Sequence, residues 1–165
     1  MRRVLRRREF IADDWRHLGE EAVAAADARG LIVPLAELRA HPQAWSEHPA
    51  RLGIRIGPAD KVEDLAAELK RCTLIAVEFP APTEGRGYTQ GRLLRGRFGF
   101  TGELRAVGAA VKRDLIFALA RCGFDAFEVA PGEDLAACVD AYSRYTVAYQ
   151  SGAPGSLTLQ RRYSA

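Results

Sequence analysis

The residues best suited to chemistry in this sequence are concentrated between Thr83 and Gly108, a stretch dense in arginine and glycine. A planar guanidinium binds phosphate, sulfate or carboxylate through two parallel hydrogen bonds, and glycine lets a backbone approach a ligand closely. Three interpretations are open: a phosphate-binding loop, a patch that grips an anionic partner, or a helix punctuated by glycine. The choice depends on the glycine spacing and on the elements that position the arginines.

The glycines of this stretch do not match a nucleotide-binding motif. Gly85, Gly87 and Gly91 have one residue more between the second and third glycine than the dinucleotide-binding pattern, and two prolines separate them from the preceding strand. The chain contains no Gly-Lys-Ser/Thr sequence, which excludes a Walker A loop. The spacing therefore disfavours a nucleotide site.

An anion site at a helix start fits the stretch better. A helix is expected from about Tyr88 to Phe98, and the free N–H groups at a helix N-terminus attract anions. Arg86 lies beside this start and Arg92 lies one to two turns into the helix, so each is either an anion ligand or a surface residue. Arg95 and Arg97 are expected on the solvated outer face.

Two carboxylates are candidates for acid–base or ion-pair roles. Glu78 ends an apolar strand at the edge where α/β sheets bind ligands, which makes it a candidate general base. The alternative is an ion pair with Arg105 or Arg86. Asp114 borders the apolar stripe of a later helix and is expected to pair with Arg105.

Metal and thiol chemistry are not indicated. The three cysteines contain no Cys-x-x-Cys pair, which excludes a zinc knuckle or a thioredoxin-type redox pair. Each lies in or beside an apolar helical pattern and is expected to be a small buried hydrophobe. The three histidines lack metal-ligand spacing, so no metal site is expected and any cofactor is left unknown.

Short apolar strands alternate with helices from Leu31 onward. Strands are expected at residues 31–33, 52–56, 73–79, 103–108, 126–131 and 146–150. Helices are expected from Pro34, over 60–69 with an Asp60–Glu63 capping box, and over 88–98, 111–122 and 135–142.

This alternation predicts an α/β fold with a mostly parallel sheet. An open, doubly wound sheet is favoured because the strands are too few to close a barrel, and a partial (β/α) barrel is the alternative. Residues 1–30 are expected to form a strand or hairpin extension packed on a single domain at 31–150, followed by a loosely held tail at 151–165. Ligands of such sheets bind at the carboxyl ends of the strands, here residues 57–60, 78–87, 108–110 and 130–134.

The composition argues against nucleic acid and membranes as partners. The 165 residues carry a net charge of only +3, which does not argue for nucleic acid. No apolar run approaches the roughly 20 residues of a membrane span, and the N-terminus lacks the apolar core of a signal peptide. A cytoplasmic protein is expected, with a homo-oligomer left open.

The segments GRGYTQGRLLRGRFGFTGELRAVG and RDLIFALARCGFDAFEV resemble an uncharacterised bacterial family, domain of unknown function 934, often labelled a probable oxidoreductase of sulfite reduction. The segments WRHL, LIVPLAEL, LGIRI and LIAVEFP agree with it, so the similarity covers about Trp15 to Val129. The chain matches the family's core motif at Arg86, Gly87, Tyr88, Gln90, Arg92, Arg105, Asp114, Arg121, Cys122, Gly123 and Phe124.

Two positions depart from the family pattern. Glu84 stands where the family usually has aspartate before Gly-Arg, and Ala109 stands where an acidic or amide residue usually follows RAVG. If the residue at position 109 were catalytic in the family, activity here would be in doubt.

The resemblance implies a cytoplasmic protein tied to assimilatory sulfate reduction and encoded with the sulfite reductase haemoprotein. Sulfite reduction itself requires cofactor chemistry, and three cysteines cannot ligate an iron–sulfur cluster alone. We therefore expect an accessory protein that binds the sulfite reductase haemoprotein subunit or a small anion at the strand ends. The alternative is an oxidoreductase with a flavin or nicotinamide in an atypical α/β site, and the sequence leaves open whether the chain is an enzyme. The binding candidates are Glu78, Arg86, Gly87, Tyr88, Gln90, Arg92, Arg105 and Asp114.

Overall fold

A computed structural model of the chain describes residues 3–19, 30–46, 48, 51–143 and 152–153. Its strands are β1 (Arg3–Arg6), β2 (Glu9–Ala12), β3 (Trp15–His17), β4 (Gly30–Pro34), β5 (Arg51–Ile56), β6 (Leu74–Glu78), β7 (Glu103–Val107) and β8 (Ala126–Phe127). Its helices are α1 (Leu35–Ala40), α2 (Pro42–Ser46), the 3₁₀ helices η1 (Val62–Leu65) and η2 (Glu68–Lys70), α3 (Arg86–Gly96), α4 (Arg113–Arg121) and α5 (Leu135–Ser143). None of the helices in these ranges is long and apolar enough to span a bilayer.

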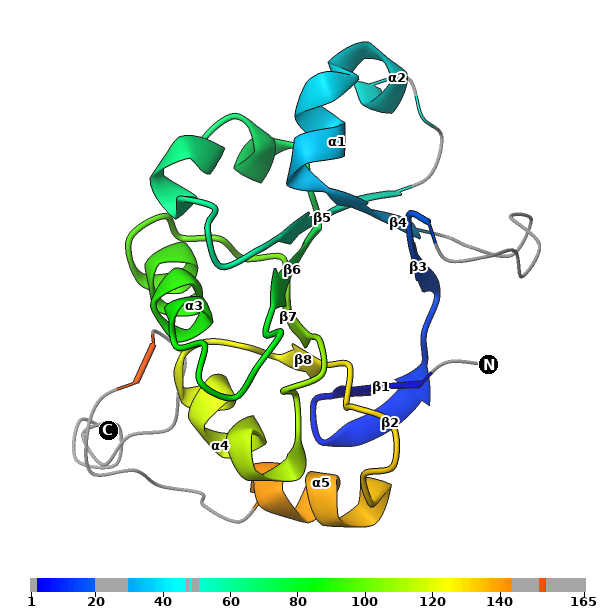
Figure 1. The fold of residues 1–165 in the computed structure, drawn as a ribbon, viewed down its shortest axis with the longest axis vertical. Coiled ribbons are helices and arrows are strands. Elements are labelled where there is room, and N and C mark those ends of the chain that lie inside the picture. Colours follow the sequence, from blue (N-terminus) through cyan, green and yellow to red (C-terminus); the bar gives the residue numbers. More distant parts are fainter. Residues whose placement is uncertain (1–2, 20–29, 47, 49–50, 144–151, 154–165) are drawn as a thin grey trace, which may run out of the picture.

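The strands form one eight-stranded sheet in the order β2-β1-β8-β7-β6-β5-β4-β3, curled into a half-barrel (Figure 1). Strands β3 to β8 run parallel to one another. Strand β1 pairs antiparallel with both β8 and β2. The prediction of a mostly parallel sheet is therefore corrected to a mixed sheet, because the N-terminal residues extend the sheet as a hairpin.

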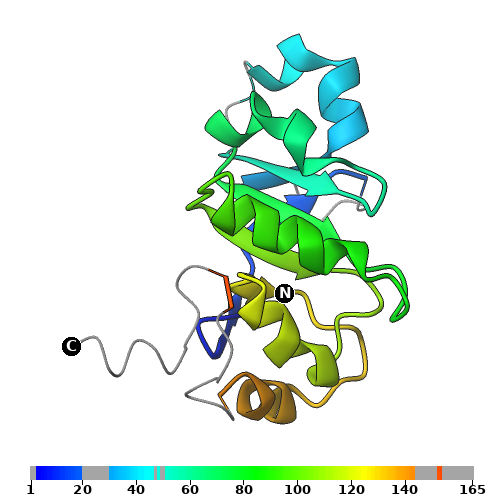
Figure 2. The same cartoon turned by 90° about the vertical axis from the view of Figure 1, so that its left-hand side faces the viewer.

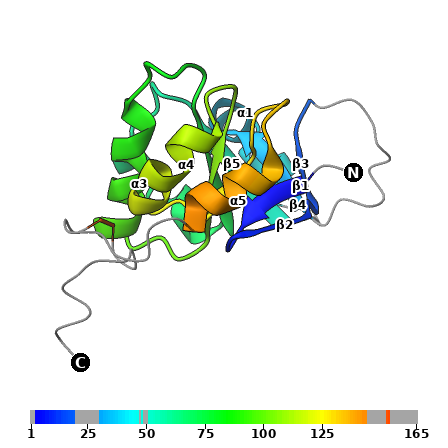
Figure 3. The ribbon, with the colours of Figure 1, turned by 90° about the horizontal axis from the view of Figure 1, so that it is seen from below.

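The hairpin is one of the two forms predicted for the N-terminal residues. Its two-residue turn has positive φ at Arg7 (49°) and Arg8 (71°), the backbone of the primed turns that match the twist of paired strands. Seen from below, α5 lies along this hairpin and beside α4 (Figure 3). The strands before residue 30 thus belong to the same sheet as the rest of the domain.

The curl gives the sheet two different faces. On β6, Ile75 and Val77 join the large core under the helices, whereas Leu74 and Ala76 face the concave side with Trp15. The helices lie along the convex side, and Figure 2 looks onto them with the strands behind. A doubly wound sheet would carry helices on both faces, so the preferred topology is not confirmed. The arrangement corresponds to the partial-barrel alternative.

Most predicted strands are found, but one predicted helix is wrong. Residues 60–69 form η1 and η2 rather than an α-helix. The Asp60 carboxylate accepts a hydrogen bond from the Gly57 N–H at 2.7 Å, so it closes a turn instead of capping a helix. Helix α3 begins two residues earlier than predicted, at Arg86. The strand predicted at 146–150 lies outside the described residues.

Trp15 fills the amino-terminal part of the concave face. Its ring packs directly on Gly30 of β4 and on Gly53 of the neighbouring strand β5. Gly53 lies two positions beyond Arg51, the register partner of Gly30. A Cβ atom at Gly30 would overlap the indole, so this glycine makes room for the ring. The packing ties β3 to the sheet and leaves the carboxyl ends of the strands for polar side chains.

Candidate functional site

A buried arginine lies at the centre of the concave face. Arg105 Nη1 contacts Asp13 Oδ2 at 3.0 Å and Glu128 Oε1 at 2.9 Å, and Arg105 Nη2 contacts Glu103 at 2.6 Å. His17 Nε2 lies 2.9 and 3.1 Å from the two oxygens of Glu128. We call these five residues the Arg105 cluster. Burial alone would lower the pKa of Arg105, but the carboxylates outweigh it and raise that pKa, so the guanidinium stays charged.

The members of the cluster come from four separate parts of the sheet. Glu103 and Arg105 are two positions apart on β7, so both side chains point to its concave face. His17 lies at the carboxyl end of β3. Asp13 is in the connection between β2 and β3, and Glu128 directly follows β8. Curling of the sheet brings these strands around the same interior.

The His17–Glu128 contact is the part of the cluster with acid–base potential. A carboxylate bonded to one ring nitrogen fixes the orientation of an imidazole. Arg105 binds Glu128 and so fixes its carboxylate, which in turn orients the imidazole of His17. The arrangement places an oriented imidazole at the carboxyl end of β3.

Two charged side chains lie nearer the rim. Arg55 is paired in register with Ala76, and Glu78 lies two positions further along the same face of β6. The two are diagonal neighbours on adjacent strands, where long side chains can meet. Both are half-buried, and in the part of the chain that the structure describes neither side chain makes a hydrogen bond or ion pair. We call Arg55 and Glu78 the rim pair.

Gln90 supports the loop beside the rim pair. Its Nε2 donates to the carbonyls of Gly57 at 2.9 Å and Asp60 at 2.8 Å, fixing the loop that follows β5. Its Oε1 is buried and accepts no hydrogen bond within the described ranges. A Cβ at Gly57 would lie 3.9 Å from Glu78 Oε2, so this loop borders the rim pair. Of the sequence candidates, the structure brings Glu78 and Gln90 to the same edge of the sheet.

At the start of α3, where the sequence predicted an anion site, a carboxylate of the chain itself binds Arg86. Arg86 is exposed and makes two hydrogen bonds to Glu84, each 2.9 Å long. Glu84 also accepts from the Arg86 backbone N–H at 3.1 Å. These hydrogen bonds lower the pKa of Glu84 and raise that of Arg86. A carboxylate thus sits where an anion was expected.

Two glycines of α3, Gly87 and Gly91, make room for aromatic rings packed against the helix. A Cβ at Gly87 would lie 2.5 Å from Phe79 Cζ, and one at Gly91 would lie 2.5 Å from Phe124 Cε2. Tyr88 meets Phe79 edge-on, with ring centroids 5.4 Å apart. Because Gly87 and Gly91 have no side chains, α3 can lie close to the sheet. This packing explains the spacing of the two glycines without a bound nucleotide.

Several predicted contacts of charged residues are wrong. Asp114 is exposed and lies 3.3 Å from Arg113, so it does not pair with Arg105. Glu78 pairs with neither Arg105 nor Arg86, because those two arginines have other carboxylate partners. Arg92, on α3, is exposed.

Arg95 also corrects the prediction for the outer face of α3. Its side chain is only 12% exposed and donates to the carbonyls of Gly123, Phe100 and Gly102 and to Asp125. Arg97, its neighbour, is exposed as expected, with Glu63 at 3.8 Å. Asp125, which Arg95 contacts, also accepts a hydrogen bond from the Leu104 N–H at 2.8 Å.

Sequence reasoning missed most of the Arg105 cluster and half of the rim pair. Asp13 and His17 lie in what was interpreted as an extension, and Arg55 lies inside an apolar strand. One available signal was alternation: in ELRAV, Glu103 and Arg105 fall on the face opposite Leu104 and Ala106. Two opposite charges on the inner face of a buried strand indicate an internal ion pair. Across the described residues no group of three His, Cys, Asp or Glu side chains is arranged to hold a metal.

The comparisons identify a family but no activity. Residues 53–159 match the model of a family described as bacterial protein of unknown function (DUF934). The match begins at Gly53, within β5, and continues through β6, β7 and β8. It includes the rim pair, Gln90, Arg105 and Glu128 but not Asp13 or His17. No curated protein matches the chain. Because the matched region is well over half of the sequence, the chain belongs to the DUF934 family.

Proposed function

We propose that this protein binds a small oxyanion at the carboxyl ends of β5 and β6, as an accessory protein of assimilatory sulfite reduction. The observation that carries the binding proposal is the rim pair. Arg55 and Glu78 are half-buried and have no partner within the described chain. Withdrawing charges from water costs free energy unless something pairs with them, so a bound ligand is the natural counterpart.

The two charges restrict the ligand. Arg55 suits an anionic group, because a guanidinium can make two parallel hydrogen bonds to neighbouring oxygens. Glu78 would repel a ligand that is only anionic, but it accepts a hydrogen bond from one that still carries an acidic proton. Hydrogensulfite has both features, whereas sulfate at neutral pH has no proton to donate. We therefore propose selectivity for sulfite over sulfate.

The place in metabolism rests on the sequence resemblance. The motif from Gly85 to Gly108 is similar to a family linked to sulfite reduction, and the expected partner is the sulfite reductase haemoprotein subunit. In this role the protein would hold sulfite and deliver it to the reductase.

Growth on defined sulfur sources tests the proposal. In a bacterium encoding this chain, a deletion strain should grow on sulfide or cysteine but poorly on sulfate or sulfite, because sulfide bypasses the reduction step. Wild-type protein and the control Arg97→Met should restore growth, whereas Arg55→Met and Glu78→Gln should not. Equal growth of the deletion strain on all four sulfur sources would remove the pathway assignment.

Binding is tested separately by calorimetry. Sulfite should bind at least tenfold more tightly than sulfate, the gain expected from one charge-assisted hydrogen bond (about 1.5 kcal/mol or more). Arg55→Met should abolish the binding.

A pull-down with the sulfite reductase haemoprotein subunit tests the partner. The oxidoreductase alternative predicts instead a thermal shift with FMN, FAD, NADH or NADPH.

A further inference from the structure

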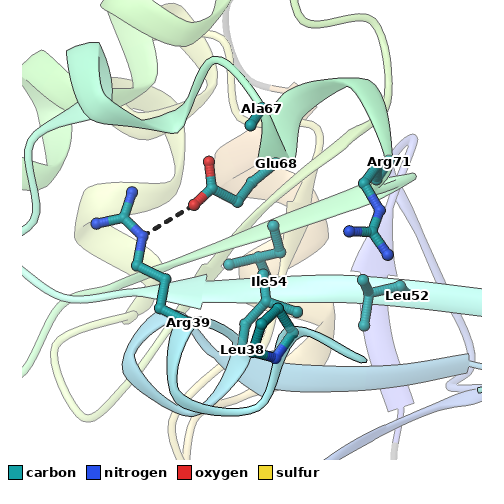
Figure 4. A pocket seen from close by; sticks show the side chains of 8 residues that line it. Leu38, Arg39, Leu52, Ile54, Ala67, Glu68 and Arg71 are labelled. Carbon is teal, nitrogen blue, oxygen red and sulfur yellow. Dashed lines mark hydrogen bonds and ion pairs between the residues drawn. The ribbon is translucent and has the colours of Figure 1, made fainter. Parts of the chain in front are cut away.

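A separate pocket of about 240 Å³ lies on the convex side of the sheet (Figure 4). Its wall is mostly apolar, with three charged side chains at its edge. The lining residues are Leu38, Arg39, Pro42, Leu52, Ile54, Ala67, Glu68 and Arg71. Because Ile54 and Arg55 are consecutive on β5, the pocket and the rim pair are on opposite faces of the same strand.

The pocket follows from the short helices between β5 and β6. Where an α-helix was expected, η1 and η2 are about one turn each, so they cover less of the sheet than a continuous helix would. Leu65 and Val62 reach the core, but Ala67 is small and leaves space above Leu52. Helix α1 closes the other side with Leu38. The result is an apolar recess between α1 and η2.

The charges at its edge are unevenly paired. Arg39 Nε donates to Glu68 Oε1 at 2.8 Å, and Arg39 Nη2 donates to the Asp64 carbonyl at 2.7 Å. Arg71 is exposed, and its side chain makes no hydrogen bond or ion pair with any residue that the structure describes. Figure 4 shows its guanidinium directed toward β5 beside Leu52, at the far end from the Arg39–Glu68 pair. Two arginines and one glutamate leave the lining with one net positive charge.

We propose that this pocket binds a small aliphatic carboxylate. The hydrocarbon tail packs against Leu38, Leu52 and Ile54, and the carboxylate binds the guanidinium of Arg71. An apolar recess with one convergent polar group is the usual form of a small-molecule site, and this one is smaller than the pockets of drug-sized ligands (about 300–1,000 Å³). The Arg39–Glu68 pair is neutral overall and closes the other end without repelling the ligand.

The test is an NMR titration of the full chain with straight-chain carboxylates from butanoate to octanoate, each matched with the alcohol of the same length. Methyl signals of Leu38, Leu52 and Ile54 should shift. The carboxylate should bind at least about tenfold more tightly than its alcohol, because hydrogen bonds to a charged group are stronger than those between neutral groups. Arg71→Met should remove that difference, and Arg71→Lys should restore part of it. Ala67→Leu should block both ligands by filling the recess.

Arg113→Met, which removes an exposed arginine on α4, should leave the titration unchanged. Thermal melts of each variant confirm that it is folded. The proposal is overturned if no carboxylate shifts these methyl signals at millimolar concentration, if acid and alcohol bind equally to the wild-type protein, or if Arg71→Met retains the preference. None of these readouts depends on Arg55 or Glu78, so failure here and failure of sulfite binding are distinguishable.

Discussion

Arg105 Nη1 lies 3.0 Å from Asp13 Oδ2, and the two side chains are 1% and 0% exposed although 92 positions separate them in the sequence. This ion pair joins β7, in the middle of the sheet, to the connection that leads into β3. Asp13 also accepts from the Trp15 N–H at 3.1 Å, so it anchors the start of β3 as well. The contact therefore holds the N-terminal strands to the interior of the half-barrel.

Removing the guanidinium should be among the most damaging single changes. Arg105→Met leaves the carboxylates of Asp13, Glu103 and Glu128 together without their central cation, and breaking a buried ion pair costs about 3–5 kcal/mol. Asp13→Asn keeps an oxygen for the Trp15 N–H and should cost less, about 1–3 kcal/mol. Urea unfolding followed by circular dichroism measures both.

The exposed pair Arg113–Asp114 provides the control. Arg113→Met should change the free energy of unfolding by no more than about 1 kcal/mol, the range of surface ion pairs. The costs of Arg105→Met and Asp13→Asn should also be less than additive in the double variant, because both report one interaction. Full additivity, or an Arg105→Met cost equal to the control, would contradict the role assigned to this cluster.

Arg95 and Arg97 form a matched test on one helix. Arg95→Met removes the donor that serves three backbone carbonyls and Asp125, so it should lower the free energy of unfolding by about 2–4 kcal/mol. Arg97→Met should cost less than about 0.5 kcal/mol, as for other exposed side chains. Chemical denaturation of the two variants at neutral pH gives the comparison, and equal costs would show that Arg95 is a surface residue after all.

The cost of Arg95→Met should also depend on pH. Burial raises the pKa of Asp125, and Arg95 opposes that rise. A carboxyl whose pKa is raised by folding binds more protons in the folded state, so it reduces stability as pH rises through its titration. Without Arg95 this loss is larger, and the variant should be closest to wild type in acid. A cost that grows on acidification would be inconsistent with this origin.

Most strands of the sheet could be predicted from the sequence because they carry strong local signals, although the antiparallel hairpin made the sheet mixed rather than mostly parallel. The run from Leu74 to Val77 is apolar on both faces, and such a run is typical of a buried parallel strand. Residues 60–69 show where local signals fail. Asp60 and Glu63 have capping-box spacing, yet Asp60 is used by the Gly57 turn and by Gln90 through its carbonyl. A tertiary contact outweighed the local preference.

The concave site was largely invisible for a different reason. Charged residues are seldom fully buried, so nothing local in the sequence places Asp13 in the interior beside Arg105. Their burial depends on meeting each other after the sheet curls, and no single segment records that curvature. Glu78 was found because its position, the end of an apolar strand, is a local property.

The packing of α3 on the sheet should not tolerate a methyl group. Gly87→Ala places a Cβ only 2.5 Å from Phe79 Cζ, and overpacking of this kind costs about 1–3 kcal/mol. Phe79→Leu in the same chain should recover part of the loss by making room. Gly85→Ala, with no atom within 4 Å of the added Cβ, is the matched control. Thermal unfolding measures all three, and an equal effect of the two glycine changes would exclude a packing role for Gly87.

Cys72 should make the protein sensitive to alkali. Burial raises the pKa of its thiol from 9.0 to about 12, so the folded state keeps a proton that the unfolded chain loses. Stability should therefore fall as pH rises from about 9 toward 12, at up to about 1.4 kcal/mol per pH unit for one proton. Cys72→Ala should lose some stability at pH 7 but show a shallower decline above pH 9. Urea unfolding of the wild-type protein and of Cys72→Ala at pH 7 and pH 10 measures both declines. The other groups that titrate in alkali are present in both proteins, so the difference between the two declines reports the Cys72 thiol. Parallel declines would show that the Cys72 thiol does not couple to folding.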